Sequence, residues 1–149
     1  MKKLFIYYSF SGSGDVVAKE LSKHGIEIRK IESKEKLPKT LFFQMMVGGY
    51  RAMVNHKAKL LDYDKDISNY DEIIIGSPIW FDRLAAPTNR ILSDLDLNNK
   101  KISFILYSGS GIANKATEKL NKMFNKVNII YLKEPKKYKE ELDKLKVYE

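Results

Sequence analysis

The chain has 149 residues, enough for one domain with its own hydrophobic core, and its 44% apolar content is ordinary for a globular protein. It contains no cysteine, which excludes disulfides, thiolate catalysis and zinc–thiolate sites, and its two histidines have no partners at ligand spacing. No apolar run approaches the ~20 residues that span a membrane, and no signal peptide opens the chain. We therefore expect a cytoplasmic protein with no membrane partner and no bound metal.

The formal net charge is +8, a balance that occurs in nucleic-acid-binding proteins and in proteins with acidic partners. The lysines are spread along the whole chain, and no cluster of basic residues is interleaved with aromatic ones. This distribution favours a solvated, lysine-rich surface over a nucleic-acid-binding one.

The first motif lies where an apolar run from Leu4 meets a helical pattern at Val17, Ala18 and Leu21. A strand that enters a helix through a Gly/Ser turn leaves the first helical N–H groups free to bind an anion such as phosphate. The pattern also fits a plain turn with a serine cap. It is neither a Walker A loop nor a dinucleotide fingerprint. The turn consists of Ser9, Phe10, Ser11, Gly12, Ser13 and Gly14.

Along the whole chain, a strand pattern followed by a helix pattern occurs five times. The later strands are expected at 26–31, 73–75, 102–107 and 127–132, and the later helices at 41–47, 84–95, 113–124 and from Pro135 onward. Gly48-Gly49 is expected to interrupt the second helix, which resumes at 50–54. The Met/Phe run in that helix is predicted to pack in the core, with a substrate-binding surface as the less favoured alternative.

The predicted fold is a three-layer α/β domain over residues 1–149, with a doubly wound, five-stranded parallel sheet. The strand at 26–31 alternates apolar and charged residues, which suits an edge, whereas those at Leu4, Ile73 and Ile102 are uniformly apolar and belong inside. This distribution gives the order 2-1-3-4-5. Ligands of such sheets bind beyond the carboxyl ends of the first and third strands, where the order reverses.

Three turns rich in small, polar or aromatic residues are therefore predicted to meet at one edge. After the turn at 9–14, the second contains the only tryptophan, which we place at an exposed loop tip where it can stack on a flat aromatic ligand. The third offers backbone donors to the polar edge of such a ring. The second turn is Ser77, Pro78, Ile79, Trp80 and Phe81, and the third is Ser108, Gly109, Ser110 and Gly111.

At these motifs the sequence resembles the short-chain flavodoxin family along its whole length. Residues 9–14 are similar to the family's phosphate loop, residues 70–80 to its third strand and the loop beside the flavin, and residues 107–111 to its third flavin loop. The resemblance implies that FMN binds at all three loops. The uninterrupted fifth strand implies that the insertion of long-chain members is absent.

Three features depart from the family pattern. Gly14 stands where the family's loop has its last hydroxyl residue. Asp15 places an acid at the start of the helix, and its carboxylate must point away from a bound phosphate. The net charge, finally, is positive. Flavodoxins that carry electrons are typically acidic, so a chain at +8 would be repelled by their basic partners.

The sequence thus leaves two functions open. The first is an FMN protein that transfers electrons or hydride with a redox partner protein or a small-molecule donor or acceptor; the flavin supplies the chemistry, and no catalytic side chain is assigned. The second is a flavin-free binding or regulatory module with the same fold.

Overall fold

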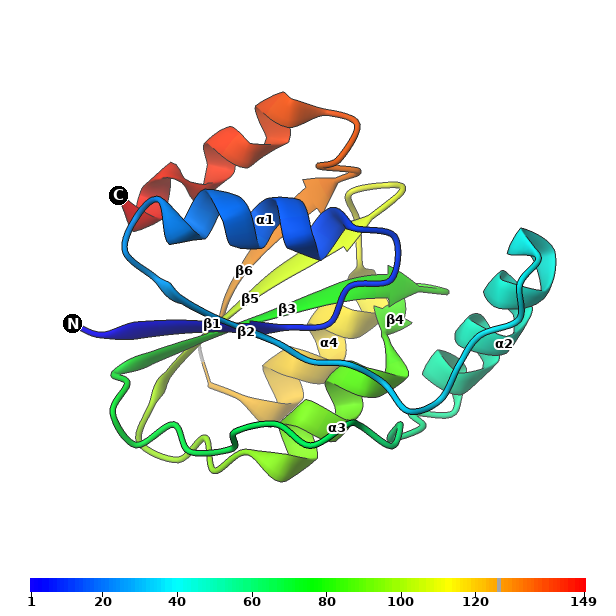
Figure 1. Ribbon diagram of the computed structural model, residues 1–149, viewed down its shortest axis with the longest axis horizontal. Helices are drawn as coiled ribbons and strands as arrows, with labels where there is room; N and C mark the ends of the chain where they lie inside the picture. The colour runs from blue at the N-terminus through cyan, green and yellow to red at the C-terminus, as the bar shows by residue number, and fades with distance from the viewer. Residues whose placement is uncertain (126) are drawn as a thin grey trace.

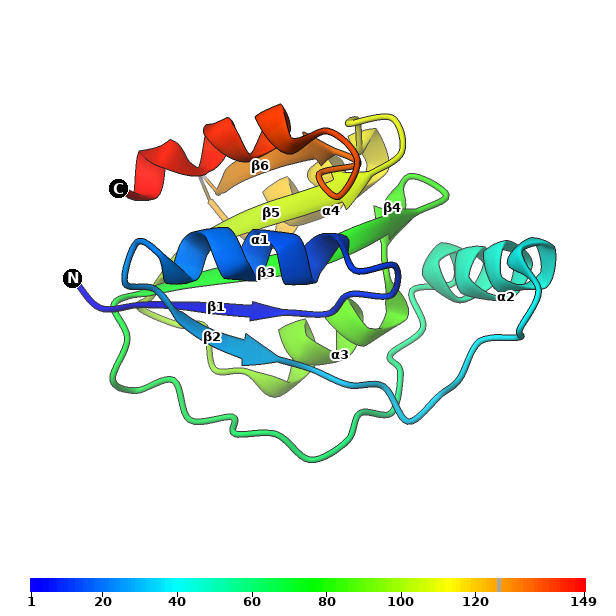
Figure 2. The same ribbon diagram turned by 45° about the horizontal axis from the view of Figure 1, so that its top comes forward.

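The computed structural model describes residues 1–125 and 127–149 and contains one mixed sheet with helices on both faces (Figures 1 and 2). Five strands are parallel in the order β2-β1-β3-β5-β6, and the short β4 pairs antiparallel with the end of β3. The predicted order 2-1-3-4-5 is therefore confirmed, with one two-residue strand added. The strands are β1 (Lys3–Tyr7), β2 (Glu27–Lys30), β3 (Glu72–Trp80), β4 (Arg83–Leu84), β5 (Lys101–Ser108) and β6 (Asn128–Lys133).

Helix α1 and the C-terminal 3₁₀ helix η1 cover one face of the sheet, and α3 and α4 cover the other (Figure 1). Helix α2 projects beyond the carboxyl ends of the strands (Figure 2). None of the helices described is long and apolar enough to cross a membrane. The helices are α1 (Ser13–Ser22), α2 (Leu41–Met53), α3 (Ala86–Asp94), α4 (Asn114–Met123) and η1 (Lys139–Tyr148).

The two faces of the central strands bury separate cores. Along β1, Leu4 and Ile6 pack toward α3 and α4, whereas Phe5 packs toward α1 and η1. Because side chains alternate across a strand, a strand covered on both faces must be apolar throughout. The edge strand β2 has no such cover, and its Ile28 is 37% exposed.

Two predicted helix boundaries were wrong. Leu84 belongs to β4, and α3 begins at Ala86, where Pro87 occupies the first turn and needs no N–H partner. The final segment becomes helical only at Lys139, as a 3₁₀ helix, because Pro135 is buried in a turn that precedes it.

Helix α2 differs most from its prediction. It runs unbroken through Gly48 and Gly49, and its large apolar side chains face solvent rather than the core. Its only buried residues are the two glycines and Ala52. The exposed fractions are 71% for Leu41, 66% for Phe42, 55% for Phe43, 57% for Met45 and 52% for Met46.

Candidate FMN site at the carboxyl edge of the sheet

The loop between β1 and α1 is organised by the hydroxyl of Ser9. Its Oγ accepts hydrogen bonds from the backbone N–H groups of Gly12, at 3.2 Å, and Gly14, at 3.0 Å. Gly12 lies at φ 97°, a left-handed conformation that glycine adopts without strain. The chain therefore turns sharply into α1 around one serine oxygen.

Several donors of this loop remain free. Among the residues described, the N–H groups of Ser11, Ser13 and Asp15 and the hydroxyls of Ser11 and Ser13 have no protein partner. Free N–H groups at a helix N-terminus, together with the helix dipole, attract an anion. The donor set fits a phosphate group.

Gly14 is explained by the packing beneath the loop. A Cβ at this position would lie 2.6 Å from Tyr107 Oη and 2.7 Å from Tyr7 Cδ2. The hydroxyl of Tyr107 donates to the carbonyl of Tyr8 and is buried there. The two tyrosines thus fill the space in which the family pattern places a hydroxyl residue.

The carboxylate of Asp15 is bound by one residue of β1 and one residue of β2. Tyr7 Oη donates to it at 2.7 Å, and Lys30 Nζ lies 3.0 Å away. Burial alone raises the pKa of Asp15, but these two hydrogen bonds and the lysine charge outweigh it, so the pKa falls below its ordinary value. Burial, followed by the bond to Asp15, raises the pKa of Tyr7. The negative charge at the start of α1 is therefore paired.

The second loop is more buried than predicted. Trp80 is the last residue of β3 and is only partly exposed, so its placement at an exposed loop tip was wrong. A Cβ on Gly48 would lie 3.1 Å from Trp80 Cε3, and one on Gly49 would lie 2.4 Å from Phe81 Cε2. The two glycines that looked like a helix break are thus the positions where α2 meets these rings.

Two aromatic rings, one just after β1 and one from the first loop, lie beside the indole. Tyr8 and Phe10 both meet Trp80 edge-on, with ring centroids 6.2 Å away. This T-shaped arrangement is favourable for aromatic pairs. The region beside the 9–14 loop is therefore aromatic.

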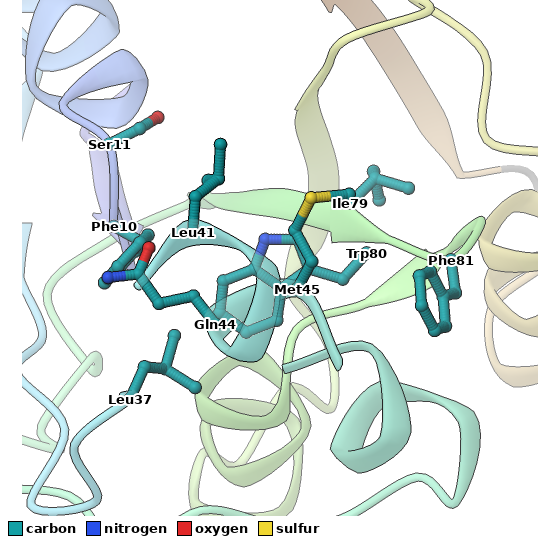
Figure 3. A pocket seen from close by; sticks show the side chains of 9 residues that line it. All are labelled: Phe10, Ser11, Leu37, Leu41, Gln44, Met45, Ile79, Trp80 and Phe81. Atoms are coloured by element: carbon teal, nitrogen blue, oxygen red, sulfur yellow. The ribbon is translucent and has the colours of Figure 1, made fainter. Parts of the chain in front are cut away.

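A pocket of about 240 Å³ opens between the first two loops and α2 (Figure 3). Its lining is mostly apolar, which suits a flat heteroaromatic ring, with Gln44 as a polar group. The preferred prediction that the Met/Phe run packs in the core was wrong, and Met45 of that run lines this pocket. The lining residues are Phe10, Ser11, Leu37, Leu41, Gln44, Met45, Ile79, Trp80 and Phe81.

The other predicted site residues lie at the same sheet edge but outside this pocket. Pro78 is buried and pairs with Tyr107 of β5. The third loop, Ser108–Gly111, is closed on itself, since Ser108 Oγ accepts the N–H of Gly111 at 2.9 Å. A residue that the sequence did not indicate, Lys136, reaches the first loop instead, where Nζ donates to the Ser11 carbonyl at 3.1 Å.

A doubly wound parallel sheet with a turn of free N–H donors after β1 and an aromatic pocket at the switch point is typical of the flavodoxin-like proteins. The family model for flavodoxin matches residues 2–147, and the chain belongs to this family. A search of curated proteins found no significant match.

Solved structures share the fold at low sequence identity. A suspected flavoprotein from Bacteroides eggerthii DSM 20697 superposes with a TM-score of 0.71 at 20% identity, covering 86% of this chain and 84% of that one. A flavoprotein from Lactobacillus acidophilus NCFM, solved in complex with FMN, superposes with a TM-score of 0.65 at 23% sequence identity. The match covers 87% of this chain and 89% of that one. Oxidised flavodoxin 1 from Bacillus cereus superposes with a TM-score of 0.51 at 16% sequence identity, and the match covers 99% of this chain and 97% of that one.

Proposed function

We propose that the chain binds FMN and takes part in electron transfer or flavin-dependent redox chemistry. One observation supports this above the others: the free donors of the 9–14 loop and the aromatic pocket at Trp80 lie side by side at the switch point of a flavodoxin fold. The Lactobacillus acidophilus relative, solved with FMN, has the same fold and supports the choice of flavin.

In this proposal each part of the site has one task. The N–H groups and hydroxyls of Ser11 and Ser13 bind the phosphate, and Ser9 fixes the loop that presents them. Phe10 and Trp80 hold the ring system and exclude water from one side of it. The bound flavin supplies the one- or two-electron chemistry, and the protein positions it.

The partner is proposed from charge. No acidic residue occurs from Lys36 to Leu61, a segment that includes the pocket wall and five lysines or arginines. This positively charged surface repels basic proteins. An acidic redox protein or a negatively charged small molecule is therefore the better electron partner.

A second candidate is a reductase of a small apolar or quinone-type acceptor. The exposed Leu41 and Met45 favour it, since they extend the apolar wall beside the ring site into solvent. Assays of the FMN-loaded protein with NADH or NADPH and a quinone separate this activity from simple electron carriage.

The test of FMN binding is the chromophore itself. The protein, purified without added flavin, is expected to be yellow, and extraction followed by chromatography should release one FMN per chain. FAD as the stoichiometric ligand contradicts the proposal. A colourless chain that binds no flavin on titration supports the flavin-free module.

A further inference from the structure

Lys136 lies across the candidate phosphate loop although the two are 125 positions apart in the chain. Its Nζ donates to the Ser11 carbonyl, and a Cβ on Gly12 would lie 3.5 Å from the same nitrogen. The lysine stem therefore runs over the turn from which the free N–H groups project. Among the residues described, no carboxylate lies within ion-pair distance of this ammonium group.

The position of Lys136 is set by the turn that follows β6. Glu134, at φ 39°, donates its N–H to the Ser108 carbonyl, and its own carbonyl accepts the N–H groups of Lys137 and Tyr138. Pro135 is buried within this turn. Tethered to the end of β5, the turn places one lysine over the phosphate loop by its backbone geometry rather than by an ion pair.

Two neighbouring lysines are engaged elsewhere. The ammonium groups of Lys133 and Lys137 lie over the ring of Tyr138, at 5.6 Å and 5.2 Å from its centroid. Lys30 is paired with Asp15. Of these four cations, Lys136 is the one directed at the loop.

The phosphate of a flavin nucleotide brings about −1.5 to −2 charges at neutral pH. The helix dipole supplies only about +0.5 at the N-terminus of α1, and the hydroxyl that the family pattern has at position 14 is missing. The loop alone therefore leaves most of the phosphate charge without a counter-charge.

We propose that Lys136 is the counter-charge of the flavin phosphate and makes this chain select FMN over flavins that lack a phosphate. The inference rests on the proposed FMN function. An ammonium group donates to phosphate oxygens in a charge-assisted hydrogen bond and compensates for the hydroxyl lost at Gly14.

The experiment compares FMN with riboflavin, which has no phosphate. Dissociation constants of both are measured by quenching of flavin fluorescence for the wild type, Lys136→Met, Lys136→Arg and Lys137→Met, at several salt concentrations. Lys137→Met is the matched control, since it removes an adjacent exposed lysine that faces Tyr138. Thermal melts confirm that each variant folds.

In Lys136→Met, FMN is expected to bind about ten- to a hundredfold more weakly, while riboflavin affinity is unchanged. Lys136→Arg should keep most of the preference, Lys137→Met all of it, and the salt dependence of FMN binding should flatten in Lys136→Met alone. If the wild type prefers FMN and Lys136→Met retains that preference, or loses both flavins equally, the inference is wrong while FMN binding stands. A wild type that binds neither flavin overturns the proposed function and the inference with it.

Discussion

Replacing Ser9 by alanine tests whether this side chain holds the phosphate loop together. The substitution removes one oxygen that accepts two backbone N–H groups, those of Gly12 and Gly14. Each neutral hydrogen bond contributes about 0.5–1.5 kcal/mol, so the two together give about 1–3 kcal/mol. The loop is half-exposed and water can reach the freed donors, which favours the lower half of that range. For a chain of this size, we expect the melting temperature to fall by roughly 2–8 °C.

Urea and thermal unfolding, followed by far-UV circular dichroism without ligand, measure this loss. Ser11→Ala is the matched control, because the Ser11 hydroxyl has no partner in the part of the chain described and its removal should leave the unfolding midpoint unchanged. FMN affinity should fall in both variants, because Ser9→Ala disturbs the loop geometry and Ser11→Ala removes a donor to the phosphate. Equal stability of Ser9→Ala and Ser11→Ala would refute the role given to Ser9.

Ser11→Ala should weaken FMN about ten- to a hundredfold and leave riboflavin unaffected; equal weakening of both flavins would exclude the loop as the phosphate site. FMN should quench most of the fluorescence of the single tryptophan. Trp80→Ala should weaken FMN binding by about 1–2 kcal/mol and shift the reduction potential of the flavin, and unchanged affinity and potential would rule out the stacking role. Gly49→Ala forces a methyl against Phe81, 2.4 Å from Cε2, and should cost about 1–3 kcal/mol of unfolding free energy, with wild-type stability as the contrary result. Asp15 has a lowered pKa, so its bonds stabilise the fold above its ordinary value near 3.8 and lose that effect as the pH falls through the lower, folded-state pKa. Asp15→Asn should accordingly be less stable than wild type at pH 7, and the difference should vanish in strong acid; a constant difference in urea melts across that range would contradict the pairing.

The sheet order could be predicted because burial on two faces leaves a direct trace in composition. A strand such as Ile73–Ile75 is apolar at every position, whereas residues 26–31 alternate, and this contrast separates the centre from the edge. The turns at the carboxyl ends could then be brought to one edge by topology alone.

The α2 wall could not be predicted in the same way. A run such as Phe42–Met46 has the same composition whether it fills a core or faces solvent, and only the position of the helix decides between the two. Gly48 and Gly49 suggested a break because local propensity contains no information about the rings that pack there. Lys136 was missed because its contact spans 125 positions and follows from one turn geometry.

Helix α2 has a consequence for local stability, since its buried side consists of Gly48, Gly49 and Ala52 alone. Such small residues remove little apolar surface from water, so detaching this helix costs far less free energy than opening the sheet. Its amide protons should exchange with solvent long before those of β3. We therefore expect the wall formed by Leu41 and Met45 to detach and rebind while the rest of the domain stays folded, which would let the pocket beside Trp80 accept ligands of different size.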